Sequence, residues 1–256
     1  MMADRNIDIN NRNTDKLFFI TGIIMLISEI IKQLLLTFII GGGKYNWWYF
    51  PFQLCSIPMY MLLIYPWIKR RMAKLSMLCF LMSYTLLSGM MAFADTSGMH
   101  YPLAILTVHS YAWHILLILI GTASGIIYLR TEKERSRYGD VYKRGTHIRG
   151  NLNVGDSDID RGSLNLSFCP FIYATVIYLS CCLIAELLDH VLDGFGTINM
   201  FYINTDYLMQ QVVFRELIPL TGNTAAIIIY IAATVLGAFI LFNIWAFIFK
   251  RSAFGK

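Results

Sequence analysis

One cysteine lies in a sequence context that suits chemistry better than packing. Cys55 occurs in Phe-Pro-Phe-Gln-Leu-Cys-Ser-Ile-Pro, residues 50–58, where polar and proline residues interrupt an apolar run. A proline bends a membrane helix and frees a carbonyl, and such distortions line cavities. By contrast, Cys79, Cys181 and Cys182 lie within apolar runs, where a cysteine is usually a small buried filler, and Cys169 lies at the edge of one.

Two histidines are candidate bases for a Cys55 nucleophile. His109 and His114 belong to the segment HSYAWH, and the helical rise places them roughly 10 and 18 Å below the outer membrane boundary. Five residues turn a helix so far that the two rings point roughly 140° apart, which does not suit a shared metal ion. The sequence therefore predicts no metal site and no cofactor. The simpler interpretation of each histidine is a hydrogen-bonded contact between helices.

Three charged residues fall inside apolar segments, where ionisable groups by default mark function. Glu29 and Lys32 are three residues apart and share a helix face, so a self-satisfied ion pair is the alternative interpretation. Glu186 lies in the outer part of a later segment. With Cys55 and the histidines, these residues all fall in the outer half of the bilayer, with Glu29 near its middle. We therefore expect a shared polar cavity that opens to the outer leaflet.

The chemistry that these residue types suit is acyl transfer. A thiolate is the reactive form of cysteine, and a neighbouring histidine generates it. Cys55 would attack an ester carbonyl, and His109 or His114 would take the proton. A third group, Glu186, Glu29 or Gln53, would orient or polarise the reacting groups. A cavity reached from within the bilayer predicts a lipid ester as the substrate, so membrane lipids are the expected partners.

The elements that must position these residues are membrane helices. The chain of 256 residues is 57% hydrophobic and only 14% charged, whereas soluble proteins carry about 25% charged residues. A water-soluble fold could not cover so much apolar surface. The net charge of +5 is modest, and nucleic-acid binding is not expected. Six segments suit spanning helices: Leu17–Ile40, Phe50–Ile68, Ala73–Ala94, Pro102–Leu129, Phe168–Leu192 and Thr224–Phe249.

Basic residues alternate strictly between successive connections. They are frequent in the tail at 1–16, at 69–74, at 130–161 and at the C-terminus, whereas the other three connections hold only Lys44 and Arg215. Because cytoplasmic loops are enriched in Lys and Arg, six spans place both termini in the cytoplasm. The polar tail at 1–16 shows no cleavable signal peptide. We predict an all-α, polytopic bundle in the cell membrane, with a bacterial plasma membrane as the expected location.

Two long connections divide this bundle. The helices at 17–129 are followed by a basic, Gly/Asn/Asp-rich connection at 130–167, which predicts a flexible cytoplasmic loop. The helices at 168–250 enclose an external segment at 193–223 and precede a short cytoplasmic tail at 251–256. The segment at 193–223 is too polar to span the membrane, and we expect a cap or an interfacial helix over the outer mouth of the bundle, at Met200–Leu220.

The motifs together resemble the YwaF family of bacterial integral membrane proteins. FPFQLCSIPMY at 50–60 is similar to that family's PxxLCS segment, and SEIIKQ at 28–33, HSYAWH at 109–114 and INMFYIN at 198–204 are similar to its other motifs. The resemblance covers most of residues 17–249 and extends to the transmembrane protein 164 family. It implies a cysteine-centred lipid acyltransferase with Cys55 as nucleophile and His114 or His109 as base. Asn204, within the last motif, joins Gln53, Glu29, Lys32 and Glu186 as a predicted substrate-binding residue.

An alternative function remains beside the enzyme. The same polar residues would suit a non-catalytic protein that binds a lipid or small molecule, or a small transporter that uses Glu29, Lys32 and Glu186 as a polar path. A through-path requires polar groups at the cytoplasmic side, and the inner halves of the predicted helices hold almost no ionisable residue. This distribution argues against transport.

Overall fold

The computed structural model of the chain describes residues 12–149 and 167–254 and is built from helices, with no strand in either range. Five helical stretches are long and apolar enough to cross a membrane: Arg12–Ile40, Arg71–Ala94, Ala104–Arg135, Cys169–Phe195 and Asn223–Arg251. Their outward faces carry many large apolar side chains, as a bilayer requires. The all-α, polytopic membrane bundle is therefore confirmed.

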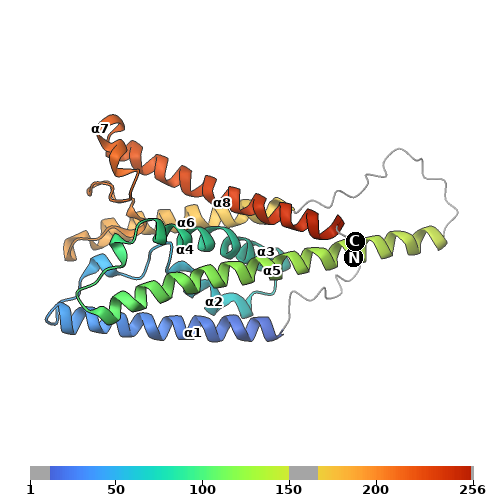
Figure 1. Cartoon of the computed structure of the whole chain (residues 1–256), viewed down its shortest axis with the longest axis horizontal. Coiled ribbons are helices and arrows are strands. Elements are labelled where there is room, and N and C mark those ends of the chain that lie inside the picture. The colour runs from blue at the N-terminus through green and yellow to red at the C-terminus, as the bar shows by residue number, and fades with distance from the viewer. Residues whose placement is uncertain (1–11, 150–166, 255–256) are drawn as a thin grey trace.

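The helices run back and forth between two ends of the bundle (Figure 1). Helix α1 (Arg12–Leu34) begins, and helix α8 (Asn223–Phe254) ends, at one end, which we call the inner end because both termini are predicted to be cytoplasmic. The segment between α6 (Cys169–Leu192) and α8 lies at the opposite, outer end. This arrangement places the connections in the alternating order that their basic residues predict.

The second predicted span is not a continuous helix. Residues 50–56 form turns, α2 covers only Ile57–Ile64, and a 3₁₀ turn, η3 (Tyr65–Trp67), follows. Prolines explain this interruption, because each lacks an N–H and disfavours helical conformation in the residue before it. Helix α2 nevertheless packs closely beside α1, since a methyl group added at Gly22 would lie 3.0 Å from Leu63 N.

The third span lies at the centre of the bundle. It consists of α3 (Arg71–Phe80), the π-helical turn η4 (Leu81–Thr85) and α4 (Leu86–Ala94), and it contacts α5 (Ala104–Arg149), α6 and α8. The π-helical turn redirects a backbone carbonyl, and the indole N–H of Trp245 donates to Met82 O at 3.1 Å. Inside this core, Tyr84 stacks on both Phe80 and Tyr178.

The connection at 130–167 differs from the prediction in its first half. Helix α5 continues without a break to Arg149, so residues 130–149 are helical rather than a flexible loop. Glu, Lys and Arg are good helix formers, and their polarity only removes this stretch from the membrane. Its first turns pack on the bundle, where Glu132 pairs with Arg71 at 3.3 Å. The Gly/Asn/Asp-rich remainder, residues 150–166, lies outside the described residues.

The external segment does not form the interfacial helix that was one of the two alternatives for it. No single helix covers Met200–Leu220; the structure has only the short turns η6 (Asp193–Phe195), η7 (Met200–Tyr202), η8 (Arg215–Leu217) and α7 (Ile218–Thr221). Long stretches between them are irregular and are held by side-chain hydrogen bonds. We call residues 193–222 the cap, because they cover the outer end of the bundle (Figure 1).

Candidate functional site

Cys55 lies in the turn that precedes α2, at the outer end of the bundle. Its side chain is half-buried, and it forms no disulfide. The indole N–H of Trp113 in α5 donates to the Cys55 carbonyl at 3.1 Å. The Cys55 carbonyl belongs to a turn, outside any helix, and a side chain from another helix binds it. This contact fixes Cys55 against the face of α5 that carries Trp113.

The two histidines occupy different positions on α5. His109 precedes Trp113 by four residues, and their ring centroids lie 5.6 Å apart, so both belong to one helix face. His109 Nε2 is buried and has no hydrogen-bond partner among the described residues. His114 instead has Nδ1 2.8 Å from Ser110 O. Because a carbonyl only accepts, the proton lies on Nδ1 and Nε2 of His114 keeps its lone pair.

Glu29 and Lys32 of α1 form an ion pair at the same end of the site's elements. Lys32 Nζ is 2.8 Å from Glu29 Oε1, and the Glu29 side chain is almost completely buried. Gln33 also donates to this Glu29 oxygen at 2.7 Å. The charges of Glu29 and Lys32 act on Cys55 and on His109. The predicted residues of α1 therefore lie within electrostatic range of Cys55 and of His109 in α5.

Gln53 and Asn204 bind protein backbone in the structure. Gln53 Nε2 donates to Asn199 O at 2.9 Å, and Phe201 N donates to Gln53 Oε1 at 2.6 Å. Asn204 Nδ2 donates to Ile198 O, while its Oδ1 accepts from Asp206 N. Both amides thus hold the cap in a fixed conformation. Because Gln53 is two residues from Cys55, it joins the cap directly to the cysteine turn.

An acidic residue near the end of α6, which the sequence analysis did not select, has a similar role. Asp189 is buried, and both its carboxylate oxygens accept from Met200 N, at 2.9 and 3.0 Å. Asp189 and Gln53 therefore bind two successive N–H groups of the cap. The only sequence signal for this contact was the position of an acidic residue one turn before the end of a helix. Acidic residues are too common at such positions for this signal to predict a partner.

The backbone of the cap is strained where it approaches Cys55. Phe201 and Tyr202 have φ values of 54° and 59°, in the left-handed region that non-glycine residues rarely adopt. The Tyr202 side chain lies within electrostatic range of Cys55. Burial raises the pKa of Tyr202 to about 12, so its hydroxyl stays protonated at neutral pH and can donate a hydrogen bond. Sequence reasoning did not select this residue.

Glu186 is not brought into the site. Its side chain is exposed on α6, and no hydrogen bond or ion pair links it to another described residue. It lies one turn before Asp189, whose side chain turns into the bundle instead. Glu186 acts on Asp189 electrostatically, and the structure gives it no link to Cys55.

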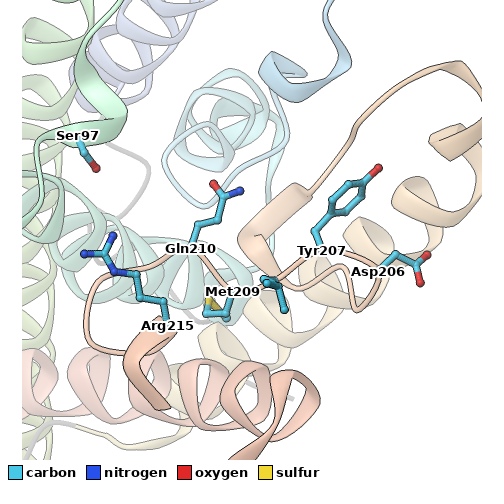
Figure 2. A pocket seen from close by; sticks show the side chains of 7 residues that line it. Ser97, Asp206, Tyr207, Met209, Gln210 and Arg215 are labelled. Carbon is cyan, nitrogen blue, oxygen red and sulfur yellow. The ribbon is translucent and has the colours of Figure 1, made fainter. Parts of the chain in front are cut away.

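An open hollow of about 530 Å³ lies at the outer surface (Figure 2). Ser97 lines it from the loop after α4, and the cap provides the rest of its lining: Asp206, Tyr207, Leu208, Met209, Gln210 and Arg215. None of the predicted site residues lines this hollow. It is a separate surface feature of the cap and is not the Cys55 site.

The described side chains offer no obvious place for a metal ion. No three His, Cys, Asp or Glu side chains in residues 12–135 and 167–251 lie close enough together to hold one. The groups near Cys55 are therefore a thiol, two imidazoles, one ion pair and tyrosine hydroxyls.

Comparison with known proteins gives no relative for this arrangement. The chain matches no protein-family model, no curated protein and no solved structure. The resemblance to the YwaF family rests on its short motifs and stays a prediction.

Proposed function

We propose that this integral membrane protein transfers or hydrolyses the acyl group of a lipid ester, with Cys55 as nucleophile. The observation that carries the proposal is that Trp113 contacts both partners. It binds the Cys55 backbone and packs against the His109 ring. A half-buried cysteine and an imidazole with an unpartnered buried nitrogen therefore both lie next to one indole.

The proposed reaction has two balanced steps. In the first, the Cys55 thiol gives its proton to a histidine nitrogen and its sulfur forms a bond to the ester carbonyl carbon. The carbon–oxygen bond then breaks, and the leaving alcohol takes the proton from the imidazolium. In the second step, water or an acceptor hydroxyl gives its proton to the histidine and attacks the thioester. The carbon–sulfur bond breaks, and the thiol is restored.

His109 is the better candidate for the base. It shares with Trp113 the face of α5 that meets Cys55, whereas His114 is displaced from Trp113 by one residue, about 100° around the helix. Its Nε2 also has no partner among the described residues and is free for proton transfer. His114 keeps a lone pair on Nε2 and is retained as the second candidate.

Two further groups would stabilise negative charge as it develops on the carbonyl oxygen. The Lys32 ammonium acts on Cys55 and on both histidines, although its pairing with Glu29 reduces its effect. The Tyr202 hydroxyl stays protonated and belongs to the strained part of the cap near Cys55. Preorganised donors of this kind often supply the largest single contribution to catalysis.

A thioester-trapping experiment tests the proposal. Purified protein in bilayer nanodiscs is incubated with a phospholipid that carries an alkyne-labelled acyl chain, and the hydroxylamine-sensitive adduct is located by mass spectrometry. We expect the adduct on Cys55 and its loss in Cys55→Ala. The matched control is Cys181→Ala, because Cys181 is also half-buried. An adduct spread equally over several cysteines, or lipid turnover unchanged in Cys55→Ala, contradicts the proposal.

The same assay separates the two histidines. We expect His109→Ala to reduce the rate of adduct formation by about 10²-fold or more, the usual contribution of a general base. His114→Ala should change this rate by much less. The opposite order would assign the base to His114.

A second candidate function, transport of a small polar solute, is favoured by one observation. The hydroxyls of Thr85, Ser124 and Tyr128 are buried in the bundle with no hydrogen-bond partner among the described residues. Such groups are rare in apolar cores and would suit a hydrated path. Flux in proteoliposomes that Ser124→Ala blocks and Cys55→Ala leaves unchanged would favour transport over acyl transfer.

A further inference from the structure

A second hollow, of about 320 Å³, lies at the inner end of the bundle. It is formed between the first turns of α1 and the end of the second span. Its lining residues are Arg12, Asp15, Lys16, Phe19, Pro66 and Trp67. The Cys55 site is at the outer end, so this hollow does not belong to it.

The hollow carries an excess of positive charge. The Asp15 carboxylate binds Lys74 Nζ with both oxygens, at 2.8 and 3.0 Å. Lys74 is only 1% exposed and lies 4.8 Å from the centre of the Tyr65 ring. The one acid in the lining is therefore neutralised from inside the bundle. Arg12 and Lys16 are exposed and have no acidic partner among the described residues.

The apolar side of the hollow continues along α1 into the membrane. Trp67 is 65% exposed and meets Phe19 edge to face at 5.2 Å, as in the aromatic belt of a membrane–water interface. Arg12, Lys16, Ile20 and Ile24 follow one another at a spacing of four, so each lies next to the one before it in a row that winds slowly around α1. The two isoleucines are exposed. Two cationic side chains are therefore followed along α1 by a stripe of exposed apolar side chains.

We propose that this hollow binds the phosphodiester headgroup of an anionic phospholipid. Arg12 and Lys16 would bind the phosphate oxygens, Trp67 would pack against the glycerol region, and an acyl chain would lie along the stripe that contains Ile20 and Ile24. Basic hollows between membrane helices on the cytoplasmic side suit acidic headgroups. A soluble anion would gain the charge contacts without the apolar stripe. The site is independent of the chemistry at Cys55.

Lipid binding can be measured directly on the full-length protein. The protein is purified in detergent and titrated with phosphatidylglycerol or phosphatidylcholine, and bound lipid is counted by native mass spectrometry. Glycerol-1-phosphate and inorganic phosphate serve as headgroup sources without acyl chains. We expect one phosphatidylglycerol to bind more tightly than any phosphatidylcholine, and neither soluble phosphate to compete at equal concentration.

A charge-neutral variant, Arg12→Gln/Lys16→Gln, tests the site itself. We expect phosphatidylglycerol binding about thirty-fold weaker, because each cation near a membrane surface strengthens binding roughly fivefold. Both side chains are exposed, so the fold should tolerate the change. Trp67→Ala is a second variant, which alters the lining of the hollow without altering its charge. The matched control is Lys250→Gln, an exposed cation near the inner end of α8 that does not line the hollow.

Three results would overturn the proposal. The first is equal binding of phosphatidylglycerol and phosphatidylcholine to the unmodified protein. The second is a loss in Lys250→Gln as large as in the double variant, which would indicate general surface charge. The third is competition by inorganic phosphate at the concentration of the lipid, which would indicate an anion site without a lipid.

Discussion

Individual polar residues near Cys55 divide into two groups by what their hydrogen bonds do. Gln53, Asp189 and Asn204 bind the backbone of the cap. His109 Nε2 has no such bond, and the Cys55 side chain is only half-buried. The sequence predicted the depth of the polar residues but not this division, because periodicity cannot show which side chain meets which backbone group. Asp189 was passed over for that reason, and Glu186, which looked more costly to bury, is exposed.

We expect Gln53→Ala to loosen the cap. The change removes a donor to Asn199 O and an acceptor for Phe201 N and leaves both backbone groups without these partners. Its cost should be about 1–3 kcal/mol of unfolding free energy, the usual penalty for unsatisfied buried groups. Thermal unfolding in detergent measures it. Gln210→Ala, an exposed change within the cap, should have almost no effect, and equal effects of the two changes would refute the assigned role.

At the scale of elements, continuous apolar runs were predicted well and irregular segments poorly. Five of the six predicted spans are long helices, because hydropathy and length suffice for them. The second span is broken at its prolines, which had been noted as a distortion but not as the end of a helix. Of the cap and the interfacial helix expected at Met200–Leu220, the helix is absent, because side-chain bonds from Asp189 and Gln53 hold the local backbone there. Such tertiary contacts are not visible in local sequence.

Val213 is a strained residue of the cap that offers a simple test. Its φ is 76°, which is costly for a β-branched residue, while its side chain is 64% exposed and packs little. We expect Val213→Gly to raise the unfolding free energy by about 1 kcal/mol, because glycine adopts this conformation without strain. The same change at Val212, whose φ is not positive, should lower it slightly. Thermal unfolding of both variants would show whether the signs differ as expected.

Two small residues allow close helix packing around α5. A methyl group at Gly121 would lie 2.8 Å from Leu86 Cβ, and one at Gly125 would lie 2.4 Å from the Trp245 ring. This spacing of four is the pattern by which membrane helices approach closely. We expect Gly125→Ala to destabilise the protein by about 1–3 kcal/mol through overpacking. Gly98→Ala is the control, since nothing lies within 4 Å of its added methyl group. Unchanged denaturant resistance in Gly125→Ala would contradict the packing described.

At the scale of the whole molecule, composition and charge order predicted the architecture. The low charged fraction required a bilayer, and the alternation of basic connections required an even number of crossings. The structure places the start of α1 and the end of α8 at one end, as an even number demands (Figure 1). For the site, the sequence predicted only how deep in the bilayer its residues would lie. Which helix faces meet depends on how the helices pack across one another and on the break in the second span. Neither follows from the spacing of residues along the chain.

The orientation of the bundle can be checked by labelling cysteines in intact cells with a membrane-impermeant maleimide. Cys169 is exposed at the inner end and should react only after the membrane is permeabilised. A cysteine introduced as Ser97→Cys, in the outer loop after α4, should react without permeabilisation. The positive-inside distribution gives this expectation. Labelling in the reverse order would invert the topology and move the Cys55 site to the cytoplasmic leaflet.

Helix α5 extends well past the inner end of the other helices (Figure 1). From Arg130 to Arg149 it adds about 30 Å of backbone at the ordinary helical rise. A force on this extension would act on the same continuous helix that carries Trp113 and His109 near its other end. The inner end of the bundle would thereby have a mechanical connection to the outer end, where Cys55 lies.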